Sequence, residues 1–170
     1  MINPAELDLK EETVIRVTRV AKVTSRGKNF RFGALVVVGD GKGHVGIGQG
    51  KAGEVMSAIN KAKEDAKQNI VRIPLVNGTI PHKIVSRYSS SQVMLKPAAP
   101  GTGIIAGGAI RSVCEVLGIQ DVVAKSLGSA NPHNVLKACV NGLKSQNSPK
   151  ILSAIRGKKI SEIVQKREGK

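Results

Sequence analysis

Residues 34–52 read ALVVVGDGKGHVGIGQGKA, and the fold of the first half of the chain follows from them. Residues 30–38 are mostly β-branched, aliphatic or aromatic, which is typical of a strand. In residues 44–50 glycine alternates with other side chains, so glycine takes one face of a second strand and apolar residues take the other. The Asp40-Gly41 pair between the two segments suits a tight hairpin turn.

The segments on either side complete this unit. Residues 14–23 divide into two alternating sets rich in β-branched side chains, which predicts a strand ahead of the polar turn at residues 24–29. Residues 52–69 carry apolar side chains at the 3.6-residue period of a helix packed on one side. We therefore predict three antiparallel strands with a helix over one face of the sheet.

The pattern restarts after Ile73-Pro74-Leu75, where we expect a domain boundary. In order, we expect strands over residues 83–88 and 92–96, a helix within 104–117, a short strand over 121–127, and a helix that starts at Pro132 behind the N-cap Asn131. This ββαβα order predicts a two-layer α/β unit and an α+β protein overall. The expected divisions are an acidic extension at 1–12, a first domain at 13–76, a second at 77–147 and a basic tail at 148–170.

Net charge indicates the class of partner. The 170 residues hold 27 Lys and Arg against 12 Asp and Glu, a formal charge of +15, which predicts a polyanionic partner. The excess is uneven: residues 13–87 hold 14 basic and 4 acidic residues, whereas residues 88–149 are closer to an ordinary domain. The longest apolar run, residues 34–38, is far too short to span a bilayer, and the acidic start is unlike a signal peptide, so we expect no membrane anchor. Cys114 and Cys139 fall in apolar helical patterns and are expected to be buried, reduced thiols of a cytoplasmic protein.

Enzyme motifs fail on context. Residues 41–46 fit G-x-G-x-x-G, but a strand and not a helix follows, and Glu64, at the acidic position, lies within a predicted helix. Gly50-Lys51 is followed by Ala52, where a phosphate loop needs Ser or Thr. The histidines are scattered and no cysteine pair has zinc spacing. We expect no catalytic residue, no metal and no cofactor.

The first turn carries the clearest binding signal. Basic residues crowd the hairpin around the turn, and their number exceeds what solubility requires. Such a tip can enter an RNA groove, where cations pair with phosphates and polar side chains reach 2′-hydroxyl groups. Phe30 and Phe32 share a sheet face and are expected to pack in the core beneath the helix. The candidate RNA-binding residues are Arg16, Arg19, Lys22, Ser25, Arg26, Lys28, Asn29 and Arg31, with Lys42 and Lys51 as secondary candidates.

A second glycine-rich block, residues 100–111, precedes a predicted helix. Glycines in this position expose backbone N–H groups, which favours an anion site or a close protein contact, and the local pattern fits tight loop packing equally well. We assign Gly103, Gly107, Gly108 and Arg111 to a protein interface.

Three ordered blocks carry a family resemblance. They are residues 36–52, residues 101–108 with Arg111, and residues 121–125 with 128–132. Together they resemble the signature of bacterial-type small-subunit ribosomal protein five, over roughly residues 13 to 145. The tip at residues 24–28 departs from the family by lacking the Gly-Gly pair of many members.

The resemblance implies a first domain like a double-stranded-RNA-binding domain and a second domain with a left-handed crossover, an exception to the usual hand. It implies binding to 16S-type rRNA, contacts with small-subunit ribosomal proteins four and eight, a place near the mRNA entry path and an influence on translational accuracy. It also places residues 22–28 near the spectinomycin pocket.

We therefore expect a non-enzymatic, rRNA-binding constituent of the small ribosomal subunit that is not a homo-oligomer. Its recognition would rest on phosphate neutralisation and RNA shape, since a chain with three aromatic residues has little for base stacking. Two alternatives remain: a free-standing double-stranded-RNA-binding regulator, and a phosphate-binding enzyme suggested by the glycine runs.

Overall fold

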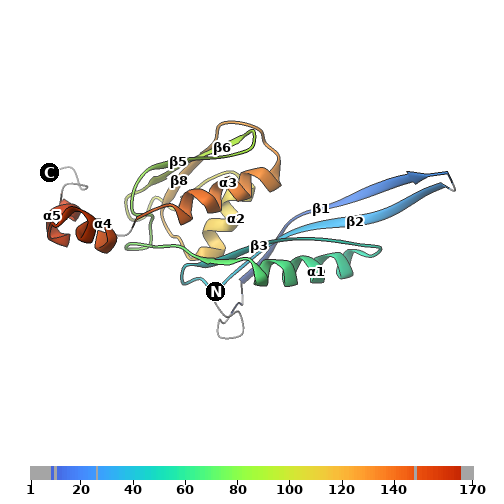
Figure 1. Ribbon diagram of the computed structural model, residues 1–170, viewed down its shortest axis with the longest axis horizontal. Helices are drawn as coiled ribbons and strands as arrows, with labels where there is room; N and C mark the ends of the chain where they lie inside the picture. The colour runs from blue at the N-terminus through green and yellow to red at the C-terminus, as the bar shows by residue number, and fades with distance from the viewer. Residues whose placement is uncertain (1–8, 10, 26, 148, 166–170) are drawn as a thin grey trace.

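The computed structural model describes residues 9, 11–25, 27–147 and 149–165. It confirms the mixed α+β class, with two four-stranded sheets in the described part of the chain (Figure 1). The first sheet is antiparallel, in the order β1 (Glu11–Thr24), β2 (Gly27–Gly39), β3 (His44–Ala52) and β4 (Ile70–Arg72), and α1 (Val55–Gln68) connects β3 to β4. The prediction of three strands was therefore one short. The missing strand, β4, has three residues, too few to show an alternating pattern.

The C-terminal half of β2 is buried on both faces of the sheet. Ala34, Val36 and Val38 pack in the cluster beneath α1. Leu35 and Val37 belong to a second cluster that includes residues from the other half of the chain. Burial on both faces explains why residues 34–38 form a continuous apolar run and do not alternate with polar residues.

Helix α1 approaches β3 closely because glycines of the strand meet alanines of the helix. A Cβ atom on Gly46, Gly48 or Gly50 would overlap the carbonyl oxygen of Ala66, Ala62 or Ala58, respectively. The three alanines are fully buried. The alternating glycines of residues 44–50 thus form the flat surface of β3 against which α1 packs.

The second sheet has the order β5-β6-β8-β7 and two helices on one side. Its elements are β5 (Ile84–Tyr88), β6 (Ser91–Pro97), β7 (Ile104–Ile105), α2 (Gly108–Leu117), β8 (Val122–Ser126) and α3 (Pro132–Lys144). Strand β7 is parallel to β8 and the other pairs are antiparallel. The predicted ββαβα order thus gains a two-residue strand before its first helix. The left hand of the β7–α2–β8 crossover stays a prediction of the resemblance.

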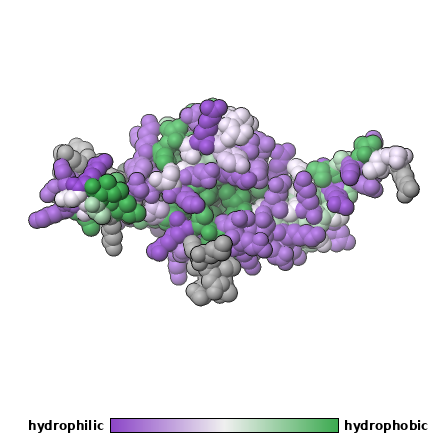
Figure 2. Space-filling model, viewed as in Figure 1, coloured by the Kyte–Doolittle hydropathy of each residue, from purple (hydrophilic) through white to green (hydrophobic). Residues whose placement is uncertain are grey.

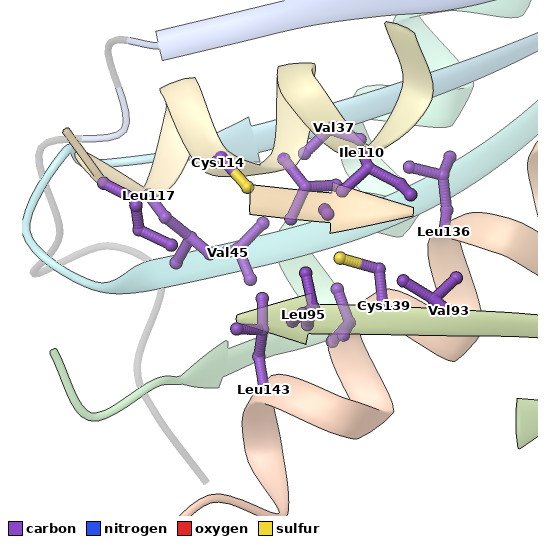
Figure 3. Packing of buried hydrophobic residues seen from close by; sticks show 14 of the residues in the cluster. Val37, Val45, Val93, Leu95, Ile110, Cys114, Leu117, Leu136, Cys139 and Leu143 are labelled. Atoms are coloured by element: carbon purple, nitrogen blue, oxygen red, sulfur yellow. The ribbon is translucent and has the colours of Figure 1, made fainter. Parts of the chain in front are cut away.

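One apolar cluster joins the two sheets, and α2 and α3 contribute to it (Figure 3). Val37 and Val45 of the first sheet lie in the same cluster as Leu95 of the second. Cys114 and Cys139 are free and buried as expected, and desolvation raises the pKa of Cys114 to about 12. Both thiols are packing residues, because burial disfavours the reactive thiolate.

The tail forms two short helices, α4 (Pro149–Arg156) and α5 (Ile160–Gln165), which pack against each other. Apolar side chains remain at the surface there, visible as green over α4 and α5 in Figure 2, and Ile155 is 71% exposed. None of the helices within the described ranges is long and apolar enough to cross a membrane.

Candidate nucleic-acid interface

Strands β1 and β2 extend beyond the rest of the first sheet as a two-stranded arm (Figure 1). The last row that includes β3 joins Arg19, Phe32 and Ala52, so the pairs from Val20–Arg31 to Thr24–Gly27 have no third strand beside them. We call residues 19–32 the arm. Most of the cations that the sequence singled out and the structure describes lie on this projection or at its base; Lys42 does not.

The strand register divides these cations between two faces, because cross-strand partners share a face and neighbours along a strand alternate. Lys22, Asn29 and Arg31 lie on one face, which also receives Arg16 and Lys51 from the base of the arm. Arg19 and Lys28 lie on the opposite face, the one that carries α1 further along the sheet. Ser25 is exposed at the tip, and Arg26 lies outside the described residues.

A pocket of about 710 Å³ opens along the arm and gathers three of the predicted cations. Lys22 comes from β1, Arg31 from β2 and Lys51 from the end of β3, and Asn29 lies beside them. All four side chains are exposed, and the pocket has no acidic residue among its described lining. This arrangement concentrates positive charge where an extended anion could lie along the strands.

The expectation that both phenylalanines are core residues was wrong for Phe30. Its side chain is 48% exposed, whereas Phe32 packs against the cluster beneath α1. Phe30 does lie on the sheet face that carries α1. However, β3 ends at Ala52, the partner of Phe32, and α1 begins after it at Val55, so the helix does not cover Phe30. The guanidinium of Arg19 covers the Phe30 ring at 3.8 Å from its centroid, so a cation–π contact replaces burial.

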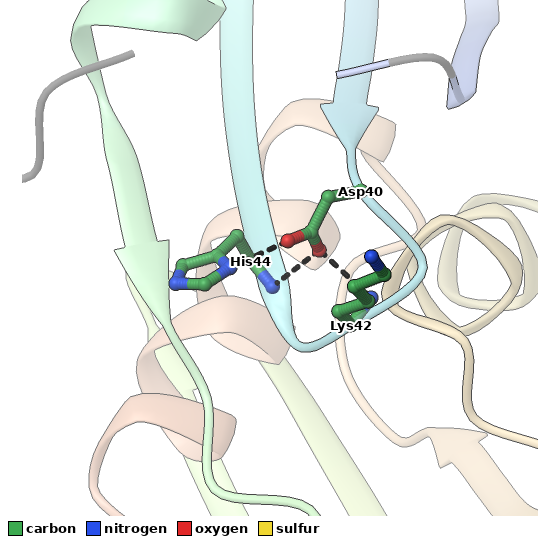
Figure 4. Close-up of polar contacts among 3 residues, drawn as sticks. All are labelled: Asp40, Lys42 and His44. Carbon is green, nitrogen blue, oxygen red and sulfur yellow. Dashed lines mark hydrogen bonds and ion pairs between the residues drawn. The ribbon is translucent and has the colours of Figure 1, made fainter. Parts of the chain in front are cut away.

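Lys42 lies at the other end of β2, about 40 Å from the tip for a strand of this length. The structure therefore does not bring it together with the arm cations. The turn that holds it has the residues 40–43, since β2 ends at Gly39 and β3 begins at His44, and it lies where the sequence predicted a turn between the two strands. In this turn the Asp40 carboxylate accepts hydrogen bonds from the backbone N–H groups of Lys42, at 2.8 Å, and His44, at 3.0 Å (Figure 4).

The Asp40 carboxylate also lies 2.6 Å from Nδ1 of the His44 ring. Burial by itself raises the pKa of Asp40, but the hydrogen bonds from the His44 ring and from the two backbone N–H groups outweigh it. The net pKa lies below the usual 3.8. The charged carboxylate therefore organises the turn and leaves the Lys42 side chain exposed.

The backbone N–H groups of the glycines in this turn are used in hydrogen bonds within the chain and are not free to hold a phosphate. The N–H groups of Gly41 and Gly43 donate to the carbonyl oxygens of Val116 and Leu117, at 3.1 and 3.2 Å, at the C-terminal end of α2. A Cβ on Gly118 would overlap the Gly41 carbonyl. Because these donors are occupied, the G-x-G-x-x-G pattern serves contact between the two halves of the chain.

The second glycine block forms an open surface. Gly103 donates its N–H to the Asp121 carboxylate at 2.8 Å, which fixes the start of β7. A Cβ on Gly103, Gly107 or Gly108 would meet nothing within 4 Å, and Arg111 pairs with Glu115 at 2.9 Å on the exposed side of α2. Gly107, Gly108 and Arg111 are exposed and Gly103 is half-buried, and the role of these residues as an interface stays a prediction.

Sequence reasoning missed a groove of about 630 Å³ between β3 and α3. Gln49, Tyr88, His133 and Lys137 line it, and the Lys137 ammonium lies 5.3 Å from the Tyr88 ring centroid. Desolvation and the nearby Lys137 lower the pKa of His133. A smaller pocket shares Gln49 and His133 with this groove and has Arg16 in its lining. No local pattern could reveal a groove whose walls come from distant parts of the sequence.

Across the described residues no group of His, Cys, Asp and Glu could hold a metal ion.

Comparison with known proteins matches both halves of the chain. The model of the N-terminal domain of ribosomal protein S5 matches residues 10–74, and that of its C-terminal domain matches residues 86–156. A small ribosomal subunit protein uS5 from Chloroflexus aurantiacus is 49% identical over 166 residues, which cover 98% of this chain and 93% of the relative. Another, from Maricaulis maris, is 51% identical over 158 residues, which cover 92% of this chain and 79% of the relative. Because these matches extend over almost the whole chain, the protein belongs to the ribosomal protein S5 family.

Proposed function

We propose that the protein is a structural, rRNA-binding constituent of the small ribosomal subunit, with the arm as its main RNA contact. Its family is one of ribosomal structural proteins, not enzymes, and the relatives are named small ribosomal subunit proteins. The observation that carries the proposal is the convergence of Lys22, Arg31 and Lys51 around one pocket of the arm.

The arm would act by neutralising phosphates along its cationic face. Three separate cations on two strands and on the adjacent end of β3 fit the spacing of a folded RNA backbone better than one isolated anion. Asn29 adds an amide for 2′-hydroxyl groups or phosphates. Phe30 is covered by Arg19 and is not a free stacking surface, which favours recognition of backbone and shape over that of bases.

The finer roles belong to the same proposal. The RNA is of the 16S type, and the neighbouring proteins are small-subunit proteins four and eight, with the surface of Gly103, Gly107, Gly108 and Arg111 as one contact. The arm tip would lie near the spectinomycin pocket, and the protein would influence translational accuracy near the mRNA entry path. The support for these roles is the resemblance of the three sequence blocks together with family membership.

The salt dependence of RNA affinity tests the arm. Replacing Lys22 and Arg31 with Ala should weaken binding to 16S-type rRNA and reduce the slope of log K against log salt by about 2, since each phosphate contact contributes about 1. Filter binding between 50 and 300 mM KCl measures this slope. Lys144→Ala, which removes an exposed cation at the end of α3, is the matched control and should leave the slope nearly unchanged.

An unaltered slope in the Lys22 and Arg31 variant would show that this face does not touch phosphates. Arg19→Ala with Lys28→Ala, on the opposite face, then tells which side of the arm binds. Sedimentation of cell extracts tests the site of action: recovery of the protein away from small subunits at high magnesium would favour a free-standing regulator.

A further inference from the structure

The second sheet has one face that no described element covers. Helices α2 and α3 lie on its inner side, where Val93, Leu95 and Val122 are fully buried. The alternate residues point to the outer side, where Val85 is 47% exposed and Ile105 is 54% exposed. The side chains of this outer face are Val85, Arg87, Gln92, Met94, Lys96, Ile105, Val123 and Lys125.

The register arranges the outer face into an apolar stripe with cations on both sides. One row across the strands reads Val85, Met94, Lys125. The next reads Lys96, Val123, Ile105. Met94 and Val123 are diagonal neighbours, within reach of each other on one face of a sheet. The aliphatic side chains therefore run diagonally over all four strands, with Lys125 on one flank and Lys96 on the other.

The charges on this face are of one sign. Strands β5, β6, β7 and β8 contain no acidic residue, and Arg87, Lys96 and Lys125 are exposed. Asp121, just before β8, is buried and accepts the Gly103 N–H, so it does not offset them. An anionic partner would thus find three cations around an apolar centre that form no ion pair with any described residue.

We propose that the outer face of the second sheet docks a protein partner whose surface has an apolar centre and an acidic rim. Protein interfaces bury an apolar core within a polar rim, and the aliphatic stripe flanked by cations is one half of such an arrangement. An RNA backbone would leave the four aliphatic side chains without a partner, and the face has no aromatic residue on which a base could stack. A second copy of the chain would oppose cations to cations. Ile105 lies between Gly103 and Gly107, so the face adjoins the predicted protein-contact surface.

This inference rests on the proposed place of the chain in the small subunit, where such a partner would be a neighbouring ribosomal protein. The test is photocrosslinking within reconstituted small subunits. The full-length chain carries p-benzoylphenylalanine in place of Val123, and the matched control carries it in place of Lys144, on α3. We expect crosslinks from position 123 that survive RNase and are destroyed by protease. They should map to one protein, on a peptide that contains Asp or Glu next to apolar residues.

Crosslinks from position 123 that go to rRNA, or no crosslink there, would overturn the inference. Charge reversal gives a second measurement: Arg87→Glu with Lys125→Glu should lower the occupancy of the crosslinked protein in subunits at least fivefold, while Lys144→Glu leaves it unchanged. Equal occupancy in both variants also counts against docking. Circular dichroism of each variant confirms that the chain is folded. Failure of the unmodified chain to enter subunits would instead refute the proposed function, so the two failures are distinguishable.

Discussion

At the residue scale, the glycines of β3 determine how closely the helix lies on the sheet. Gly46, Gly48 and Gly50 face the alanines of α1, and no side chain would fit between strand and helix at these positions. The sequence shows the alternation, but it does not show that backbone carbonyls occupy the space above each glycine. Glycine there is required by close approach, and none of the three has a positive φ.

Gly48→Ala should therefore destabilise the protein strongly. The added Cβ would overlap the Ala62 carbonyl and force α1 away from the sheet, which costs about 3 kcal/mol, the upper end of the usual range for overpacking. Urea unfolding followed by circular dichroism measures the loss. Gly53→Ala is the matched control, because a Cβ there meets nothing within 4 Å, and its unfolding midpoint should change little. Equal midpoints for the two variants would contradict the close packing of α1.

Phe30 shows where inference from single residues fails. Alternation assigned it correctly to the helix face of the sheet, but the assignment of a face does not say how far along the strand the covering helix reaches. That length depends on where β3 ends and α1 begins. The guanidinium of Arg19, a candidate RNA-binding residue, covers the Phe30 ring, which we had expected to be buried in the core.

At the element scale, the turn between β2 and β3 connects the first sheet to helix α2. Its glycine N–H groups bind the end of α2, and Asp40 holds its shape through the hydrogen bonds from Lys42 and His44. The strands predicted at residues 30–38 and 44–50 left residues 39–43 for the turn, and the observed turn has the residues 40–43. What the local sequence could not show is the contact of this turn with α2, far along the chain.

Asp40→Asn should destabilise the protein in a pH-dependent way. The pKa of Asp40 is lowered in the folded state, so its ionised form contributes stability above about pH 4 and this contribution is lost as the pH falls through the lowered value. We expect a loss of about 1 kcal/mol at pH 7, the difference between a charged and a neutral hydrogen-bond acceptor, and stabilities that converge as the pH falls through the lowered pKa. Unfolding curves from pH 2.5 to 7 measure this.

Glu64→Gln, which removes a carboxylate from the exposed side of α1, controls for a general effect of net charge. A constant difference between Asp40→Asn and the unmodified protein at every pH would show that the Asp40 charge does not hold the turn.

At the scale of the whole molecule, the two halves share one core. Val37 and Val45 from the first sheet and Leu95 from the second belong to the same apolar cluster, with α2 and α3 contributing (Figure 3). The domain boundary near residue 76 stays a prediction. It locates a change in the sequence pattern and is compatible with a core that crosses it.

Val37→Ala should therefore weaken both halves together. Removing two buried methyl groups should cost about 2 kcal/mol. Amide hydrogen exchange should show the same loss of protection in α3 as in β1–β3, because the shared cluster couples their unfolding. If α3 kept the protection of the unmodified protein while β1–β3 exchanged faster, the halves would unfold independently.

The sequence by itself determined the kind and order of most elements, since alternation, helical periodicity and capping act between residues close in the chain. It also located the cationic hairpin, and its ordered blocks indicated the family that the comparisons then established. Only the tertiary structure decided which of those cations converge: Lys22, Arg31 and Lys51 meet at the arm, while Lys42 lies at the far end of β2. Periodicity assigns a residue to a face, but strand register and the packing of distant segments fix its neighbours, and for the same reason the uncovered face of the second sheet could be recognised only in the folded molecule.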